Sequence, residues 1–584
     1  MSRLAFIQHP IAGERMTRPS LISHGLLWIV LALTALSCRS SESDGEIARV
    51  IRQRVGPAGW FQKRATVDDD DIQPLVRRFY KNREYLPAWT HIDGPTRDAG
   101  ALLEALTNAR AEGLNPAQYD VERLQKAIGK SGAPGLATEA RIAQAAALDI
   151  ELTRNFLKHA SHLYSGQVNP VQLPADWHIK PRRRDMVEVL EHAISRHQVE
   201  SSLESLTPGF PQYEELRKAL ADYRRIEAEG GWPRIPSGAT LRRGGSGARV
   251  DSLQRRLKVT GDLGGRYRAG QFDAATEAAL ERFEARHGLE SDGVAGPEDL
   301  RALNLPVTHR IRQIELNMER WRWLPDSLIG DRYLMVNIPN YSLQVVENDR
   351  TVLGMRVVVG KDYSRTPMFT DEISYMVFNP VWNVPSSIAS QEILAEVQQD
   401  PEYLQRNNIR VFENESDRAV EVDPQQIDWA SMSPEDFHYN FRQDPGPENP
   451  VGHVKFMCPN QFNVYLHDTP ANQLFAARER GFSHGCIRVE KPIDLAAYLM
   501  KDEGWDDARV VQEFGTADNT SVKVPRPIPV HIFYWTAFTD ESQGLQFRED
   551  VYDFDHLLDN VIRSKRPDIK TPVRAAITPT VVES

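Results

Sequence analysis

The sequence predicts a multidomain α+β protein: a helical scaffold, then a small unit of three helices, then a mainly antiparallel β domain with an inserted capping flap. Three observations lead to this prediction. The chain has 584 residues, which is enough for three or four domains at about 150 residues each. Apolar residues recur with helical spacing as far as Pro325. From Tyr333 onward they alternate as in strands.

The composition excludes several classes of protein. With 41% hydrophobic and 26% charged residues, the chain is neither collagenous nor broadly disordered. A net charge of −11 argues against a nucleic-acid partner, because such domains are usually basic. Cys38, Cys458 and Cys486 are the three cysteines of the chain, too few for a disulfide scaffold or a four-cysteine zinc site.

Residues 1–40 have the pattern of an export signal. Arg3, Arg15 and Arg18 precede the apolar run Leu26–Leu33, and small residues follow it. The run is shorter than the roughly 20 residues that cross a bilayer. A cleaved signal, a retained anchor and lipidation at Cys38 all stay open, as does a start at Met16 instead of Met1. We expect the rest of the chain to lie outside the plasma membrane.

The first structured region, residues 41–236, is predicted to be a helical scaffold domain. Two apolar stripes with helical spacing support it, and the aromatic residues beside them are read as core. Gly113 and Pro116 end the first stripe. The stripes consist of Leu102, Leu103, Leu106 and Ala109, and of Ala145, Leu148, Leu152, Phe156 and Leu157.

A three-helix unit is predicted for residues 240–306, after a boundary rich in Gly and Pro. Val250, Leu253 and Leu257 share one helical face. A second helix begins after the capping residue Asp273 and stops at Gly288. The segments 250–257, 272–276, 283–289 and 292–296 resemble the peptidoglycan-binding module. That resemblance implies binding to the wall, although the same residues would be needed merely to fold three helices.

The remainder is predicted to be one β domain, preceded by a linker helix over residues 307–328. Strand patterns run through residues 329–560, and a polar, partly helical insertion interrupts them at about 390–440. Residues 561–584 are expected to be a flexible tail.

Chemistry-bearing residues concentrate at the end of one predicted strand. His467 and Asp468 follow that strand, and the block Ser483–Arg488 begins after fifteen intervening residues. A thiol beside imidazoles and a cation has what a nucleophilic cysteine requires, and cationic neighbours can lower a thiol pKa from about 8.5 to between roughly 3.5 and 7.5. Cys458 is instead read as a small buried side chain. Two histidines and one cysteine without a carboxylate at ligand spacing make a poor zinc site.

This block resembles the catalytic signature of the L,D-transpeptidases, with His467, then Ser483–Cys486, then Arg488. Segments 445–447, 452–456 and 465–470, with Phe79–Tyr80 and Tyr85–Trp89, resemble the large Gram-negative subfamily. Its members combine a scaffold, a peptidoglycan-binding module and a catalytic domain with a capping insertion. The resemblance therefore implies a periplasmic or cell-envelope protein that carbapenems acylate.

The resemblance also implies roles for individual residues. Cys486 is the nucleophile and attacks the third residue of a stem peptide, while His467 is the base and the carbonyl of Asp468 orients its ring. The N–H groups of Gly485 and Cys486, with the Tyr465 hydroxyl, form the oxyanion hole, and Ser483 and His484 line the pocket. Arg488 either holds a substrate carboxylate or forms a structural ion pair.

No metal and no organic cofactor are implied. The implied partners are peptidoglycan stem peptides and glycan, with membrane association only through the N-terminal segment; other wall-synthesis partners stay unknown. Several outcomes remain open for the same thioester: cross-linking between third-position diamino acids, D-amino acid exchange, lipoprotein attachment, or hydrolysis as an L,D-carboxypeptidase. A non-catalytic wall-binding scaffold would need neither Cys486 nor His467.

Overall fold

The computed structural model describes residues 42–56, 67–132, 135–414, 419–516, 518–540 and 543–564. The predicted export segment lies outside the described residues, as do residues 565–584 of the predicted tail. The described chain forms two compact units. One comprises the described residues up to Leu106 with Ala117–Lys158 and Met186–Ser202; the other comprises Thr107–Pro116, His159–Asp185 and the described residues from Leu203 onward. Among the described helices, none has the length and apolar character of a membrane span.

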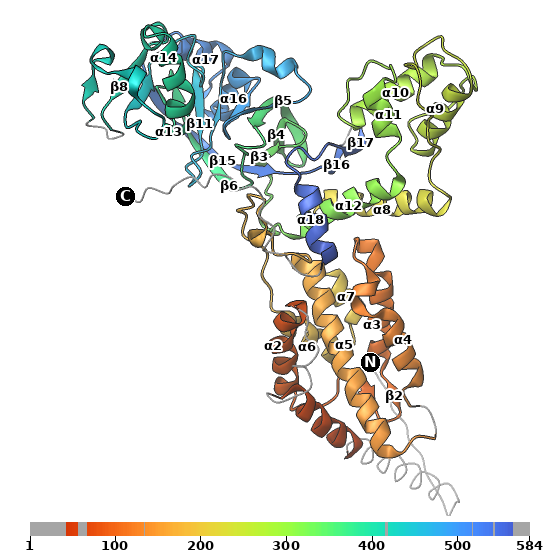
Figure 1. The fold of residues 1–584 in the computed structure, drawn as a ribbon. Helices are drawn as coiled ribbons and strands as arrows, with labels where there is room; N and C mark the ends of the chain where they lie inside the picture. Colours follow the sequence, from red (N-terminus) through yellow and green to blue (C-terminus); the bar gives the residue numbers. More distant parts are fainter. Residues whose placement is uncertain are drawn as a thin grey trace, which may run out of the picture. The chain divides into compact units, whose positions relative to one another are not determined.

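The first unit is helical, as predicted for the scaffold (Figure 1). Both predicted stripes lie on helices, and Leu102, Leu106, Leu152 and Phe156 are fully buried. The chain turns after the first stripe at Gly113, whose φ of 70° favours glycine. The elements of this region are α2 Val67–Asn82, β1 Thr90–His91, β2 Gly94–Pro95, α3 Arg97–Thr107, α4 Val121–Lys130, α5 Thr138–Ser165, α6 Met186–Arg196 and α7 Val199–Glu204.

A single buried carboxylate holds the turn before β1 against α5. Asp149 accepts hydrogen bonds from the backbone N–H groups of Ala88, Trp89 and Thr90 and from the hydroxyls of Thr90 and Tyr80. Because a buried donor without a partner is costly, one side chain here fixes a segment without regular structure. Tyr80 and Trp89 are thus core residues, as their aromatic character suggested.

The scaffold prediction of residues 41–236 differs from the observed division of the chain. Residues 107–116, 159–185 and 203–236 belong to the second unit. The reason is packing: α8 (Pro211–Ala228) lies against α12 (Val307–Arg322), the helix predicted as a linker. Leu216 and Leu220 of α8 share one hydrophobic core with Ile311 and Ile314 of α12.

The three-helix unit has the predicted form. Its helices are α9 (Ala248–Val259), α10 (Ala274–Arg286) and α11 (Pro297–Leu303), around a core of their own. Asp273 caps α10, since its side chain accepts a hydrogen bond of 3.0 Å from the backbone N–H of Thr276. Leu253, Leu257, Leu280 and Phe283 are fully buried.

The β domain is built on a nine-stranded mixed sheet with the order β13-β5-β14-β12-β11-β6-β15-β3-β4. The further pairing of β5 with β4 closes the strands from β5 to β4 into a ring. The pairs β13–β5, β12–β14 and β15–β3 are parallel, and the other pairs are antiparallel. The sheet is thus mainly antiparallel, as the sequence predicted. The strands are β3 Arg332–Asn337, β4 Ser342–Glu347, β5 Arg350–Gly360, β6 Thr370–Phe378, β11 Val454–Met457, β12 Leu466–His467, β13 Gly481–Ser483, β14 Ile487–Val489 and β15 Thr520–Phe533.

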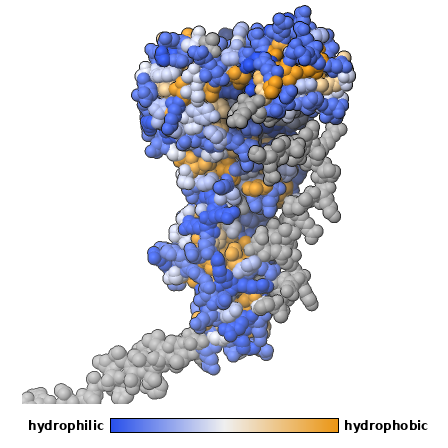
Figure 2. Space-filling view, turned by 90° about the vertical axis from the view of Figure 1, so that its left-hand side faces the viewer, coloured by the Kyte–Doolittle hydropathy of each residue, from blue (hydrophilic) through white to orange (hydrophobic). Residues whose placement is uncertain are grey.

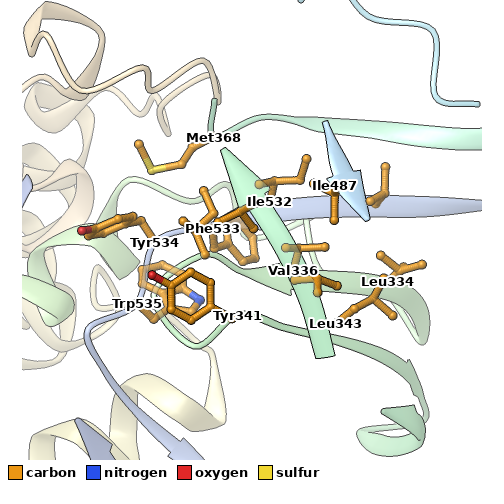
Figure 3. Packing of buried hydrophobic residues seen from close by; sticks show 14 of the residues in the cluster. Leu334, Val336, Tyr341, Leu343, Met368, Ile487, Ile532, Phe533, Tyr534 and Trp535 are labelled. Atoms are coloured by element: carbon orange, nitrogen blue, oxygen red, sulfur yellow. The ribbon is translucent and has the colours of Figure 1, made fainter. Parts of the chain in front are cut away.

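Apolar side chains from several strands fill the interior of this ring. Figure 3 shows Leu334, Val336 and Leu343 close to Ile487 and Ile532, and all five are fully buried. Ile487 follows Cys486 directly, so its burial fixes the backbone beside the thiol. The domain is completed by α16 Pro492–Leu499, α17 Asp507–Phe514, β16 Ala537–Asp540, β17 Gly544–Phe547 and α18 Phe554–Ser564, the last of which continues past the predicted boundary at 560.

The capping insertion is a small folded subdomain that is wider than the predicted range of 390–440. It lies between β6 and β11 in the chain, and Figure 1 shows its strand β8 beside the helices of the insertion. It carries its own four-stranded sheet, in the order β7-β10-β8-β9. Ile393, Val397, Val411 and Phe441 belong to its separate hydrophobic core. The polar sequence concealed this core, because the apolar residues are few and scattered. Its elements are β7 Trp382–Asn383, α13 Ser386–Ile388, the π-turn Ala389–Ile393, α14 Leu394–Gln399, α15 Tyr403–Arg406, β8 Ile409–Phe412, β9 Glu421–Val422 and β10 Asn440–Gln443.

The face of the molecule in Figure 2 is mainly hydrophilic, with hydrophobic residues in separate groups. This agrees with a mean hydropathy of −0.47. Large apolar side chains that are exposed include Tyr363 and Phe482, and Phe482 directly precedes the Ser483–Cys486 block.

Candidate functional site

Two neighbouring parallel strands bring the predicted base and nucleophile together. His467 ends β12, and Cys486 directly precedes β14. Leu466 pairs with Ile487, and the backbone N–H of Ile487 donates to the carbonyl of Tyr465 at 3.1 Å. Successive side chains of a strand point to opposite faces. Leu466 and Ile487 point into the core, so the residues beside them in sequence lie on the other face.

The same register adds a residue that the motif did not identify. Lys455 of β11 pairs with His467, and His467 pairs with Arg488 of β14. The three residues therefore form a row across three strands, with the imidazole between two cations. The Lys455 Nζ lies 4.5 Å from the centre of the Tyr465 ring, and the centre of that ring is 5.7 Å from the centre of the His467 ring.

The His467 ring is held in one tautomer. Its Nδ1 lies 2.5 Å from the backbone carbonyl of Asp468, the expected orienting group. A carbonyl oxygen can only accept, so Nδ1 carries the hydrogen and Nε2 keeps its lone pair. The Asp468 carboxylate is itself fixed by the backbone N–H groups of His453 and Thr469, at 2.8 and 2.7 Å.

Burial and the two cations keep His467 neutral. They lower its pKa to about 3, because a protonated ring would be buried and would lie beside Arg488 and Lys455. The hydrogen bond to the Asp468 carbonyl acts in the opposite direction and is outweighed. The ring is therefore a free base throughout the neutral pH range.

The Cys486 thiol differs from the expectation of a lowered pKa. Burial raises its pKa above the ordinary value, although hydrogen bonds from Tyr465 and the charges of Lys455 and Arg488 favour the thiolate. The Sγ lies 3.7 Å from the carbonyl of Asn463, to which it donates. In the free protein the pair is thus a neutral thiol and a neutral imidazole.

The turn before Cys486 is fixed by short hydrogen bonds. Ser483 Oγ donates to the carbonyl of Cys486 at 2.5 Å and accepts from the backbone N–H of Gly485 at 3.1 Å. The Thr366 hydroxyl donates to the carbonyl of Gly485 at 2.7 Å. Gly485 has a φ of 114°, which a side chain would disfavour. Its N–H donates to Ser483 Oγ, so this expected donor of the oxyanion hole is engaged within the turn in the structure.

His484 contacts the capping insertion. Its Nε2 is 2.8 Å from Oε1 of Glu392, on the π-turn of the capping insertion. The insertion therefore contacts the turn before Cys486 directly. The chain pattern around residue 390 gave no sign of this contact, since it joins segments 92 residues apart.

The other expected residues are placed as follows. Cys458 is 2% exposed, and burial raises its pKa to about 12. Arg488 forms no ion pair with any carboxylate of the described residues, and its buried Nε has no hydrogen-bond partner. Within the described ranges, no group of three or more His, Cys, Asp and Glu residues is arranged to hold a metal ion.

Lys455 and Glu392 are site residues that sequence reasoning missed. Lys455 stands between the buried residues Val454 and Phe456 on a short strand, and that alternation places it on the face opposite the core. The alternation in the sequence could have placed Lys455 on that face. Only the pairing of β11 with β12 shows that Lys455 lies beside His467.

Fold and site together define a class: a multidomain α+β protein whose closed sheet carries a thiol and a neutral imidazole on adjacent strands. Comparisons with known families agree with this class. Residues 331–524 match the L,D-transpeptidase catalytic domain, residues 74–220 a scaffold domain, and residues 246–303 the family described as "Putative peptidoglycan binding domain". The chain therefore contains segments similar to these three families, and its residues 331–524 are similar to the L,D-transpeptidase catalytic domain.

Two curated relatives match parts of the chain. A protein of Haemophilus influenzae named "Putative L,D-transpeptidase" is 34% identical over 244 residues, which are 42% of this chain and 48% of that protein. The chain thus matches about half the length of that relative. A zinc D-Ala-D-Ala carboxypeptidase of Streptomyces albus G is 44% identical over 59 residues, which are 10% of this chain and 23% of that enzyme.

Solved structures with some likeness include two L,D-transpeptidases. That of Xylanimonas cellulosilytica is 15% identical, with 51% of this chain and 99% of the other covered and a TM-score of 0.16. That of Stackebrandtia nassauensis is 13% identical, with 52% and 96% covered and a TM-score of 0.20.

Proposed function

We propose that this protein is a cysteine L,D-transpeptidase that acts on the peptide stems of peptidoglycan. The observation that carries the proposal is the placement of Cys486 and His467 on one face of adjacent strands, with Nδ1 of His467 engaged by a carbonyl and Nε2 free. The catalytic-domain family supports the same reaction class, and the peptidoglycan-binding family supports the same substrate.

Acylation begins when Nε2 of His467 takes the proton of the Cys486 thiol. The thiolate attacks the carbonyl of the third stem residue, and the Cys486 N–H and the Tyr465 hydroxyl stabilise the oxyanion that develops there. His467 then gives the proton to the departing amine, so D-alanine leaves and a thioester remains. An amine of a second stem resolves the thioester and restores the thiol.

The electrostatics suit this sequence of steps. A neutral imidazole is the form of histidine that accepts a proton, and its low pKa makes the imidazolium a strong acid for the departing amine. Lys455 and Arg488 favour the thiolate once it forms. The reaction therefore needs no thiolate in the free protein, consistent with the raised pKa of Cys486.

Purified protein incubated with disaccharide-tetrapeptide and analysed by mass spectrometry tests the proposal. We expect a thioester adduct on Cys486 that lacks one alanine residue, followed by a cross-linked dimer. Cys486→Ala should form neither product. A product shortened by one alanine without a dimer would instead identify an L,D-carboxypeptidase. We also propose a periplasmic location, since the substrate lies outside the plasma membrane.

A further inference from the structure

Lys455 and Arg488 are two cations without an acidic partner at the active site. Within the described part of the chain, neither side chain has an ion pair or a hydrogen bond to a carboxylate, and Arg488 Nε is buried without any partner. Among the described groups, an ionised Cys486 sulfur is what raises the pKa of each side chain, and that sulfur is a neutral thiol in the free protein. Burial lowers both pKa values, so holding these charges here has a cost.

The strand register directs both cations toward one place. Lys455 and Arg488 occupy the same row, one strand on either side of His467. Neighbouring strands are about 4.8 Å apart, so the two backbones are separated by roughly 10 Å. Both side chains are long enough to reach a group that lies over the imidazole and beside the thiol. A site with two cations and no anion of its own is suited to an anionic ligand.

The thiolate cannot be the anion that these cations serve throughout the reaction. When Cys486 becomes acylated its sulfur is neutral, and both cations then lack a counter-charge. The departing D-alanine, by contrast, carries a carboxylate on the carbon that bears its amine. An acceptor amine resolves the thioester by the reverse of that departure, so it occupies the same position.

We propose that Lys455 and Arg488 together bind the carboxylate on the amine-bearing carbon of both the departing amino acid and the acceptor. The inference rests on the proposed function and deepens it, because it states the class of amine that the enzyme takes. Acceptors are amines of α-amino acid centres with a free carboxylate. Simple alkyl amines and carboxamides are poorer acceptors.

The resolving step balances as follows. The acceptor nitrogen, as the free amine, attacks the thioester carbonyl, so that a C–N bond forms and the C–S bond breaks. The electron pair of the C–S bond goes to sulfur. The proton that nitrogen loses passes through His467 to Cys486, which returns to the neutral thiol. Lys455 and Arg488 hold the acceptor carboxylate throughout.

An exchange assay tests this inference on the full chain. The protein is given a tetrapeptide stem with either isotope-labelled D-alanine or isotope-labelled D-alaninamide, and incorporation of the label is measured by mass spectrometry. We expect kcat/KM for the acid to exceed that for the amide by roughly 10- to 100-fold, the usual effect of one hydrogen bond to a charged group.

Variants assign the preference to Lys455. Lys455→Met keeps the length of the side chain without its charge and should bring the acid-to-amide ratio down to within about threefold of one. Lys455→Arg should restore the preference, since the guanidinium also binds carboxylates. Lys523 is an exposed lysine of β15, and Lys523→Met should leave the ratio unchanged.

A second readout separates carboxylate binding from simple activation of the thiol. The inference is overturned if the wild type uses acid and amide equally well. It is also overturned if Lys455→Met lowers the exchange rates with D-alanine and with D-alaninamide by the same factor, and lowers the rate of Cys486 alkylation by neutral iodoacetamide by a similar factor. In both cases the acyl-enzyme still forms and the proposed function stands. Absence of any acyl-enzyme on Cys486 would instead refute the proposed function itself.

Discussion

At the scale of single residues, the site is governed by the surroundings of His467. The ring is enclosed, lies between two cations and donates to the carbonyl of Asp468. These contacts make it a base that is free over the whole neutral range, whereas an ordinary histidine has a pKa near 6.5. In the mechanism that we propose, the thiol stays protonated until this ring removes its proton.

The first prediction concerns the pH dependence of Cys486 alkylation by iodoacetamide. The pKa of His467 is about 3, so its titration should produce no inflection near pH 6.5. The rate should rise with pH through a midpoint above the ordinary thiol value of about 8.5, because burial raises the pKa of Cys486. A main inflection between pH 6 and 7 would contradict this assignment.

The second prediction divides the work between the two histidines. His467→Ala should reduce cross-linking by about 10²–10⁴, the usual cost of losing a general base. His484→Ser should keep measurable activity, because His484 contacts Glu392 of the insertion and not the thiol. Initial rates of dimer formation measure both variants. If His484→Ser were inactive while His467→Ala stayed active, the general base would be His484 instead of His467.

The third prediction compares the two described cysteines. Limited iodoacetamide should label Cys486 well before Cys458, which is 2% exposed and has a pKa raised to about 12. A carbapenem should likewise leave one adduct, on Cys486. Peptide mass spectrometry of the native protein gives the order of labelling. Equal labelling of both cysteines would count against selective reactivity.

At the scale of elements, the capping insertion is a subdomain with a sheet and a core of its own. It contacts the turn before Cys486 through Oε1 of Glu392, which lies 2.8 Å from Nε2 of His484. Removing only residues 391–440 would cut through that core, since Ile388 and Phe441 belong to it. The structure therefore gives 382–443 as the range to remove.

The fourth prediction is that replacing residues 382–443 with a short glycine linker leaves a folded domain. Cys486 should still react with iodoacetamide, but the formation of dimer from tetrapeptide should be lost if, as we propose, the insertion covers the bound stem. Glu392→Gln is the matched control: it changes only the side chain that contacts His484 and leaves the subdomain in place. Full cross-linking by the shortened protein would show that the insertion has no part in catalysis.

At the scale of the whole molecule, four buried histidines couple stability to pH. His159, His287, His467 and His531 all lie in the second unit, and burial lowers the pKa of each. An unfolded chain takes up these protons near pH 6.5, whereas the folded chain takes them up only at lower pH. Stability is therefore lost as the pH falls below 6.5. Glu284 opposes this trend, because burial raises its pKa to about 8.

The fifth prediction isolates one of these residues. Burial lowers the pKa of His531 to about 4. Between pH 6.5 and pH 5, one histidine that is protonated only in the unfolded chain lowers the free energy of unfolding by about 2 kcal/mol. The thermal midpoint of His531→Phe should therefore fall less between pH 7 and pH 5 than that of the wild type. Both proteins retain Glu284, so its opposing effect cancels in the comparison. Identical pH dependence in the two proteins would contradict the assigned cause.

Much of the architecture follows from local patterns in the sequence. The stripe around Leu102, the cap at Asp273 and the alternation after Tyr333 each depend on residues a few positions apart. The spacing between His467 and Cys486 is likewise a feature of one short segment. Helix period, capping and motif spacing are local properties, so the sequence alone determined the class of each domain and predicted His467 and Cys486 as the reactive pair.

Tertiary structure decided what depends on contacts distant in the chain. Pairing of β11 with β12, and of β12 with β14, placed Lys455 and Arg488 on either side of His467. Burial reversed the expected direction of the Cys486 pKa, since desolvation outweighed both cations. Strand register and depth of burial are set by the whole folded chain, and no local pattern records them.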